Sequence, residues 1–382
     1  MKVIVLGGAG GVGSGMIKAL IDAKDVEQVT IGDVNEERAS RILDEYQSEK
    51  LRFQVVDVSK AQNIVSHLQG MDVVANCSWY YYNLEVMQAC IEVGVDYLDV
   101  GGLYHFTLKQ MALHDRVKAA GIVAVPGLGS APGLTNVSAG YCAKRLDKVD
   151  GIYIRAADWS EGETFWQVDY SLRTVLDELF KEAPVFQDGE TKMIPPLSSS
   201  IKFVFPDPVG EVTLYDTLHS EVATLPTSYK EKGIKEVRYQ MYWPPTKIEG
   251  AKVLRELGFA DEKPLKVNGA SISPREFLHL LAASRDEGRP PNLREALAIE
   301  ARGEQKGRKT SVILRLTKVP QNVNLTSLCM AIGTLLIGRG QTEGKGIRPP
   351  EIFVDPDLFI KELLARGVTF EEELSTVQPI AL

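Results

Sequence analysis

The chain has 382 residues, of which 44% are hydrophobic and 25% charged, a composition typical of a globular protein with more than one domain. A net charge of −8 without a basic segment argues against nucleic-acid binding, and the longest apolar runs are too short to cross a bilayer. The N-terminus lacks the apolar core of a signal peptide and the four cysteines are widely spaced, so we expect a reduced, cytoplasmic protein.

The first 126 residues alternate regularly between two kinds of segment. Short apolar segments predict strands at 2–6, 28–32, 52–58, 71–77, 95–101 and 122–126. Segments with apolar residues at helical spacing predict helices at 12–23, 35–49, 61–70, 84–94 and 108–121. Such alternation predicts parallel βαβ units, and therefore an α/β fold with a doubly wound Rossmann sheet over residues 1–126.

The pattern changes at "PGLGSAPGLTNV", where two Pro-Gly steps suggest a domain boundary near Pro126. Residues 127–324 predict an α+β substrate domain, and the segment from about 325 to 382 is expected to join the first domain. In the second domain we expect helices at 136–146 and 170–183, a strand at 149–157, loops over 204–229 and a hairpin of 294–303 with 310–317. The segment 325–338 is apolar nearly all round, which predicts a buried helix between the domains, and a short amphipathic helix should end the segment 348–368.

A cofactor site is predicted by Gly8, Gly10 and Gly13, which form G-x-G-x-x-G between the first strand and the first helix. The glycines permit a tight turn and close approach of the backbone, including Gly11 and Val12, to a pyrophosphate at the helix N-terminus. The context, together with an acidic residue about twenty positions on, makes this motif specific for a dinucleotide.

The acidic residue is Asp33, which would accept hydrogen bonds from a ribose 2′-OH and repel a 2′-phosphate, so we predict NAD. Arg38 and Arg41 on the following helix would instead favour NADP, or they belong to a solvated helix face. Asp57 after the third strand is either a neighbour of the adenine or a helix cap together with Ser59.

The reaction site should lie beyond the carboxyl ends of the strands, where "GGAGGVG", "NCSWYYYN", "GGLYHF" and "PGLGSAPG" converge. We expect Asn76, Gly101 and Gly102 to contact the cofactor there. Tyr80 is open between packing and function, whereas Tyr81 and Tyr82 are expected to pack the start of a helix. Histidines near this crevice, His105 and His114, are weaker candidates for a base. No metal-binding motif is present in the sequence, so no metal is predicted.

Several segments resemble the saccharopine dehydrogenase family, and within it the lysine 6-dehydrogenases. They are "VIVLGGAGGVG", "DVVANCSWYYYNLEVMQACIEVGVDYLDVGG", "LHDRVKAAGIVAVPGLGSAPGLTNV" and "LLIGRGQTEGKGIRPPE", and the resemblance is thin across roughly 150–290. It implies an amino-acid oxidoreductase that moves a hydride between a nicotinamide and a carbon bearing nitrogen. It also implies a homodimer or higher homo-oligomer formed through the substrate domain.

The resemblance assigns catalytic roles to Tyr80 and to Asp115 in "LHDRVKAAG", either of which could manage the proton of the substrate amine. The alternative for Asp115 is a surface position paired with Arg116 or Lys118. The candidate substrate-binding residues are Tyr80, His105, Asn136 and His219.

Members that form saccharopine carry an arginine for its additional carboxylates, whereas "HSEVATLPTSY" (219–229) has none, which favours a smaller substrate such as lysine. Possible carboxylate anchors are Arg155, Arg173 and Lys230. The leading hypothesis is therefore a lysine 6-dehydrogenase that releases ammonia and 2-aminoadipate 6-semialdehyde. The alternatives are imine reduction of the saccharopine type, and a sensor that binds NAD(H) without turnover.

Overall fold

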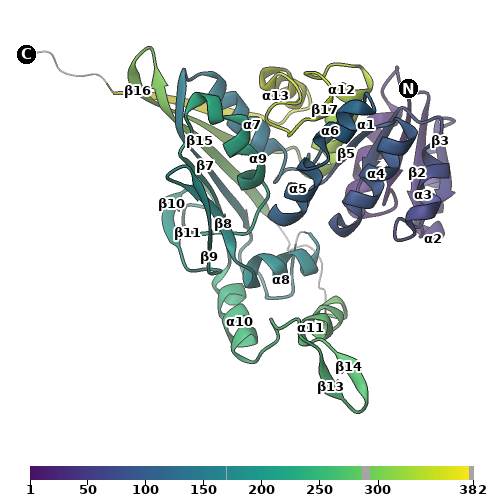
Figure 1. The fold of residues 1–382 in the computed structure, drawn as a ribbon, viewed down its shortest axis with the longest axis horizontal. Coiled ribbons are helices and arrows are strands. Elements are labelled where there is room, and N and C mark those ends of the chain that lie inside the picture. Colours follow the sequence, from purple (N-terminus) through teal and green to yellow (C-terminus); the bar gives the residue numbers. More distant parts are fainter. Residues whose placement is uncertain (169, 286–292, 378–382) are drawn as a thin grey trace, which may run out of the picture.

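The computed structural model describes residues 1–168, 170–285 and 293–377. It contains two large β-sheets that lie side by side, each with its own helices (Figure 1). In the part of the chain that the structure describes, none of the helices combines the length and the apolar character needed to cross a membrane.

The first sheet is parallel and has the strand order β17-β6-β5-β4-β1-β2-β3, which confirms the predicted Rossmann topology. Its strands are β1 (Lys2–Leu6), β2 (Gln28–Asp33), β3 (Leu51–Val55), β4 (Val73–Asn76), β5 (Asp96–Asp99), β6 (Val123–Val125) and β17 (Gly346–Ile347). The helices of this half are α1 (Gly11–Ile21), α2 (Glu36–Tyr46), α3 (Ala61–Leu68), α4 (Asn83–Val93), α5 (Tyr104–Met111) and α6 (His114–Ala119), with a 3₁₀ turn at Tyr80–Tyr82.

The prediction of one helix over 108–121 was wrong, because two helices, α5 and α6, replace it. Gln110, near the end of α5, donates a hydrogen bond of 2.6 Å to the buried carboxylate of Asp99. Val117 of α6 is fully buried. Contacts with the sheet, which the periodic pattern does not contain, therefore decide where the first helix ends.

The second sheet has nine strands and is mostly antiparallel, with the parallel pair β12–β7 at its centre. The main path runs β10-β11-β12-β7-β15-β16-β18, and β8 pairs with β12 and β9. Its strands are β7 (Lys148–Trp159), β8 (Ala183–Gln187), β9 (Glu190–Ile194), β10 (Ser200–Val204), β11 (Glu211–Asp216), β12 (Glu236–Tyr242), β15 (Arg294–Gln305), β16 (Arg308–Lys318) and β18 (Thr369–Thr376). The predicted hairpin is confirmed as β15 and β16, which pair from Ala298↔Arg315 to Gln305↔Arg308.

The helices of the second half include the predicted ones, α7 (Leu134–Lys144) and α8 (Leu172–Phe180). The prediction of loops over 204–229 was wrong in part, because β11 and α9 (Glu221–Ser228) occupy about half of this segment. Pro226 reads as a helix breaker, yet it lies near the end of α9, whose Val222 and Leu225 are buried. An excursion below the sheet in Figure 1 holds α10 (Pro245–Glu256), β13 (Leu265–Val267), β14 (Ala270–Ile272) and α11 (Pro274–Ala283).

The C-terminal part contributes to both sheets. Helix α12 (Leu325–Gly338) has the predicted bounds, is largely buried, and packs against α1, β4 and β5, while α13 (Pro356–Leu364) packs against α7. Strand β17 pairs with β6 in the Rossmann sheet, whereas β18 pairs with β16 in the second sheet. The predicted domain limits near 126 and 324 stay predictions, and residues 378–382 lie outside the described residues.

Candidate active site

The glycine-rich turn between β1 and α1 is compact because its key positions lack side chains. A Cβ on Gly13 would lie 2.4 Å from the carbonyl oxygen of Gly7, and Gly7 itself has a φ of +68°. A Cβ on Gly11, by contrast, would meet nothing within 4 Å, and Gly11 faces a large cavity. The first turn of α1 therefore opens onto free space with its N-terminal dipole, which is the arrangement that a pyrophosphate requires.

Asp33 at the end of β2 holds this turn in place. One carboxylate oxygen accepts a hydrogen bond from the backbone N–H of Ala9 and the other from that of Asn35, both at 2.9 Å. Asp57 accepts hydrogen bonds from the backbone N–H and hydroxyl of Ser59, which lower the pKa of Asp57 to about 2. The contact of Ser59 with Asp57 fits the capping alternative, and direct roles of Asp33 and Asp57 in cofactor binding stay predictions.

The turn after β4 is shaped by buried amides. The side chain of Asn76 donates to Asn83 at 2.9 Å and accepts from the hydroxyl of Ser78 at 2.6 Å, and Asn83 donates to the carbonyl of Gly101. Gly101 has a φ of +106°, and a Cβ there would lie 2.5 Å from Cγ of Pro132. Asn76 thus supports the crevice from behind, while Gly101 forms its surface.

Tyr80 lies in the crevice wall and connects the two halves of the molecule. Its hydroxyl donates a 2.8 Å hydrogen bond to the buried Asp177 of α8, which also forms ion pairs with Arg275 and Lys181. Burial, and then the negative charge of Asp177, raise the pKa of Tyr80, so the phenol stays protonated at neutral pH. Tyr81 lies with its ring against that of Phe106 of α5, with the centroids 4.8 Å apart, and its side chain is partly exposed, so its packing at the start of α4 stays a prediction.

A cavity of about 660 Å³ runs from the glycine-rich turn to the second sheet. Lining residues from the Rossmann side include Gly11, Val12, Ser78, Trp79, Tyr80, Gly101 and Gly102. Lining residues from the rest of the chain include Ser130, Asp158, Tyr170, Arg173, Glu178, His219, Tyr239, Glu295, Asn324 and Thr326. A volume of this size suits a nicotinamide with a small substrate beside it.

The part of the cavity wall that comes from the second half of the molecule carries several acidic side chains. Three carboxylates, Asp158, Glu178 and Glu295, line it, against the guanidinium of Arg173 and the imidazole of His219, among the described lining residues. Arg173 lies over the ring of Trp79 at 5.0 Å and pairs with Glu276 at 2.7 Å. This balance favours a ligand with positive charge.

The structure brings some of the predicted substrate residues together and separates others. Tyr80 and His219 line the same cavity. His105 on α5 and Asp115 on α6 are exposed and absent from the described lining, and buried Asn136 donates to Glu351 at 2.9 Å instead. The residues that the sequence reasoning missed as site residues include Asp158, Tyr170, Glu178, Glu295, Asn324 and Thr326. The sequence contained a signal for Asp158. It is an acidic residue on the same face of β7 as the apolar Ile154 and Ala156, because side chains two residues apart in a strand point to one face.

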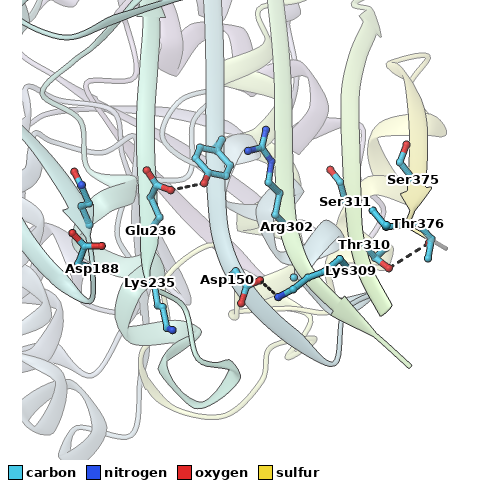
Figure 2. A pocket seen from close by; sticks show the side chains of 14 residues that line it. Asp150, Asp188, Lys235, Glu236, Arg302, Lys309, Thr310, Ser311, Ser375 and Thr376 are labelled. Carbon is cyan, nitrogen blue, oxygen red and sulfur yellow. Dashed lines mark hydrogen bonds and ion pairs between the residues drawn. The ribbon is translucent and has the colours of Figure 1, made fainter. Parts of the chain in front are cut away.

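A second hollow, of about 600 Å³, lies on the opposite face of the second sheet (Figure 2). Its charges are largely compensated: Asp150 pairs with Lys309 at 2.9 Å, and Tyr153 donates to Glu236. Because it lies away from the glycine-rich turn, we assign the reaction site to the cavity between the sheets.

A Rossmann sheet whose glycine-rich turn opens onto a cavity completed by a second sheet defines a dinucleotide-dependent oxidoreductase. Family comparison agrees: residues 3–125 match the saccharopine dehydrogenase NADP binding domain and residues 129–368 the saccharopine dehydrogenase C-terminal domain. The chain belongs to the saccharopine dehydrogenase family, as the motifs indicated, and is an NAD(P)-dependent dehydrogenase.

Two curated relatives match nearly the whole chain. Carboxyaminopropylagmatine dehydrogenase of Synechocystis sp. is 25% identical over 97% of this chain and 98% of its own length. Carboxynorspermidine synthase of Vibrio alginolyticus is 24% identical over 98% of this chain and 97% of its own length. The names of these relatives differ from the lysine 6-dehydrogenase that the sequence motifs favoured.

Solved structures show the same fold. The apo saccharopine dehydrogenase (L-Glu forming) of Saccharomyces cerevisiae has a TM-score of 0.74 at 18% identity, covering 98% of this chain and 99% of that one. Homospermidine synthase of Legionella pneumophila in complex with NAD has a TM-score of 0.66 at 16% identity, covering 98% of this chain and 91% of that one.

Proposed function

We propose that this dehydrogenase transfers a hydride to or from a carbon bonded to nitrogen in a small amine that carries further positive charge. The observation that supports this most is the cavity, which joins the turn at Gly11 to a wall containing Asp158, Glu178 and Glu295. A cation is attracted to such a wall, whereas a substrate with several carboxylates is repelled.

The residues of the glycine-rich turn fit a dinucleotide because the Cβ position of Gly11 is open and α1 begins there. Gly11 and Val12 would hold the pyrophosphate, and Gly101 and Gly102 would lie against the nicotinamide, which supplies the hydride acceptor or donor when bound. Trp79 and Tyr80 would exclude water from the reacting carbon.

The leading candidate reaction is the interconversion of a carboxylated polyamine-like secondary amine with its imine. This proposal is supported by the names of the two relatives, both of which denote carboxyl-bearing polyamine compounds. It is also supported by the charges, since three carboxylates could hold an amine or guanidinium group while Arg173 holds one carboxylate.

A second candidate is the lysine 6-dehydrogenase reaction. It is favoured by the absence of arginine from 219–229, whose His219 lines the cavity, since lysine has a single carboxylate for Arg173 to bind. Saccharopine, with three carboxylates, fits this lining least well. Catalytic action of Asp115, a homodimeric or higher assembly, and a cytoplasmic location stay predictions.

The test is a substrate panel followed by the absorbance of the reduced nicotinamide. NADPH or NADH is offered with aspartate semialdehyde and either agmatine or 1,3-diaminopropane, and NAD⁺ is offered with lysine alone. We expect turnover with one of these cationic amines, and at least about tenfold less with butylamine in place of the amine, because butylamine lacks a second charge. Equal turnover of butylamine would refute the assignment of substrate class, and dinucleotide binding without turnover of any of these amines would contradict the proposed function.

A further inference from the structure

One group of side chains at the cavity wall is linked as a relay, to which the proposed function assigns no proton transfer; Glu178 serves there only as one carboxylate of the wall. We propose that Glu178 is the catalytic group that takes the proton from the substrate nitrogen, and that His219 and Glu221 position Glu178 and adjust its charge. The proposal rests on the proposed function and names the proton acceptor that such a reaction needs.

The relay is built from helices α7, α8 and α9 and from residues just before α8 and α9. Glu178 on α8 accepts a hydrogen bond from the hydroxyl of Tyr170, and its other oxygen lies 4.0 Å from Nε2 of His219. Nδ1 of His219 is paired with the carboxylate of Glu221. The second oxygen of Glu221 accepts a 2.6 Å hydrogen bond from the hydroxyl of Thr135 on α7.

Stacking fixes the ring of His219, which lies 3.8 Å from and within 7° of parallel to the ring of Tyr239 on β12. Glu178, His219 and Tyr239 all line the cavity, whereas Glu221 is completely buried behind the imidazole. A histidine held by one carboxylate and directed at a second is an arrangement that keeps a proton-transferring group oriented.

The electrostatics agree with this geometry. The pKa of Glu178 is raised to about 7, mainly by burial; His219 and the hydroxyl of Tyr170 lower this pKa, and the charges of Asp177 and Glu221 raise it. For His219, burial opposes the positive charge, but Glu221 and Glu178 outweigh it and raise the imidazole pKa. Among the described lining residues, the other titratable or charged groups of this part of the cavity are Asp158, Arg173, Tyr239 and Glu295. A carboxyl that titrates near neutral pH can both accept and return a proton.

Two other polar groups of the wall, Tyr80 and Glu295, are engaged in hydrogen bonds of their own. The hydroxyl of Tyr80 is committed to Asp177, which in turn is held by Arg275 and Lys181. Glu295 accepts a hydrogen bond from the hydroxyl of Ser130. Glu178 combines a place in the cavity with a neighbouring imidazole that can respond to its charge.

The step itself is a proton transfer. An N–H bond of the substrate ammonium breaks and an O–H bond forms on Glu178, which leaves a lone pair on nitrogen. That lone pair becomes the C=N π bond as the hydride leaves the adjacent carbon for the nicotinamide. In the direction of imine reduction, Glu178 returns the proton to the product nitrogen.

The experiment measures kcat for amine oxidation as a function of pH in the wild-type enzyme and in variants. The substrate is the amine that the wild-type enzyme oxidises, which is either lysine or the reduced product of the panel. Wild-type activity should rise through pH about 7 as Glu178 ionises. Glu178→Gln should lower kcat by about a hundredfold or more and abolish this rise, while the Kd for NADH stays within about twofold. The matched control is Glu182→Gln, an exposed position four residues on, which should keep the wild-type profile.

A second variant, His219→Gln, keeps hydrogen-bonding capacity but removes the positive charge that lowers the pKa of Glu178. The rise in its activity should therefore move to higher pH. The proposal is overturned if Glu178→Gln keeps kcat and the rise near pH 7, or, should that variant not bind NADH, if His219→Gln leaves the rise unmoved. A wild-type enzyme that oxidises none of these amines would contradict the proposed function instead.

Discussion

Two glycines of the same turn have different physical tasks. Gly13 is required by the backbone, because a Cβ there would lie 2.4 Å from the oxygen of Gly7 and 2.7 Å from Cα of Gly8. Gly11 is not required by the protein at all, since its Cβ would point into open space in the cavity. The open space beside Gly11 leaves room for the pyrophosphate that we propose binds against this backbone.

Alanine at these two positions should separate folding from cofactor binding. Gly13→Ala should lower both the stability of the apo protein and the affinity for NADH, because the turn must deform. Gly11→Ala, at the first position of α1, should leave apo stability equal or up to about 1 kcal/mol higher, yet weaken NADH binding about tenfold or more. Thermal unfolding and NADH fluorescence titration measure the two effects, and unchanged NADH affinity in Gly11→Ala would contradict this placement of the cofactor.

Residues were predictable where their chemistry depends on local sequence. The glycines and Asp33 form a motif of fixed spacing, and His219 is one of only five histidines in the chain. Glu178 and Glu295 were not recognised, because each sits in an ordinary helix or strand pattern and gains its meaning only when α8 and β15 meet across the cavity. His105 and Asn136 show the converse. Both are close in sequence to the glycine-rich segments, but the fold leaves them outside the described lining.

At the scale of elements, α8 links three parts of the fold. One carboxylate oxygen of Asp177 accepts a hydrogen bond from the hydroxyl of Tyr80, in the turn after β4. The other oxygen pairs with Arg275 of α11. The next residue of α8, Glu178, has a carboxylate oxygen 4.0 Å from Nε2 of His219. One helix thus positions the crevice wall and the proposed proton acceptor together.

Substitution of Tyr80 and of Asp177 should lower the free energy of unfolding by different amounts. Tyr80→Phe should lower the free energy of unfolding by about 1–2 kcal/mol, because it removes one buried hydrogen bond. Asp177→Asn should cost about 3 kcal/mol or more, because the buried guanidinium of Arg275 loses its counter-charge. Urea unfolding measures both, with the exposed Glu182→Gln expected within about 0.5 kcal/mol of wild type. Equal effects of the two variants would contradict the network.

Helices and strands were predicted correctly where local sequence determines them, and incorrectly where contacts between distant segments determine them. The Rossmann half was predictable because each strand and helix has its own periodicity and short connections. The segment 204–229 was not, since β11 gains its partners from β10 and β12, which are distant signals, and α9 is buried despite Pro226. The periodic pattern likewise could not show that tertiary contacts end α5 at Met111.

On the scale of the whole molecule, the C-terminal part ties the two sheets together. Helix α12 packs on α1, where Ser327 donates a 2.8 Å hydrogen bond to the carbonyl of Val12, and Thr326 just before it lines the cavity. Strand β18 then completes the second sheet beside β16. The cavity consequently has walls from both sheets and from α12, so a cofactor bound on one sheet would meet a substrate held by the other.

The measurement that tests this most directly is a crystal structure with NAD⁺ and the amine that the panel identifies. We predict the pyrophosphate at Gly11 and Val12, the nicotinamide against Gly101 and Gly102, and the substrate nitrogen within hydrogen-bonding distance of Glu178. A nicotinamide ring outside the cavity, or an amine bound away from the carboxylates of the second sheet, would contradict the account.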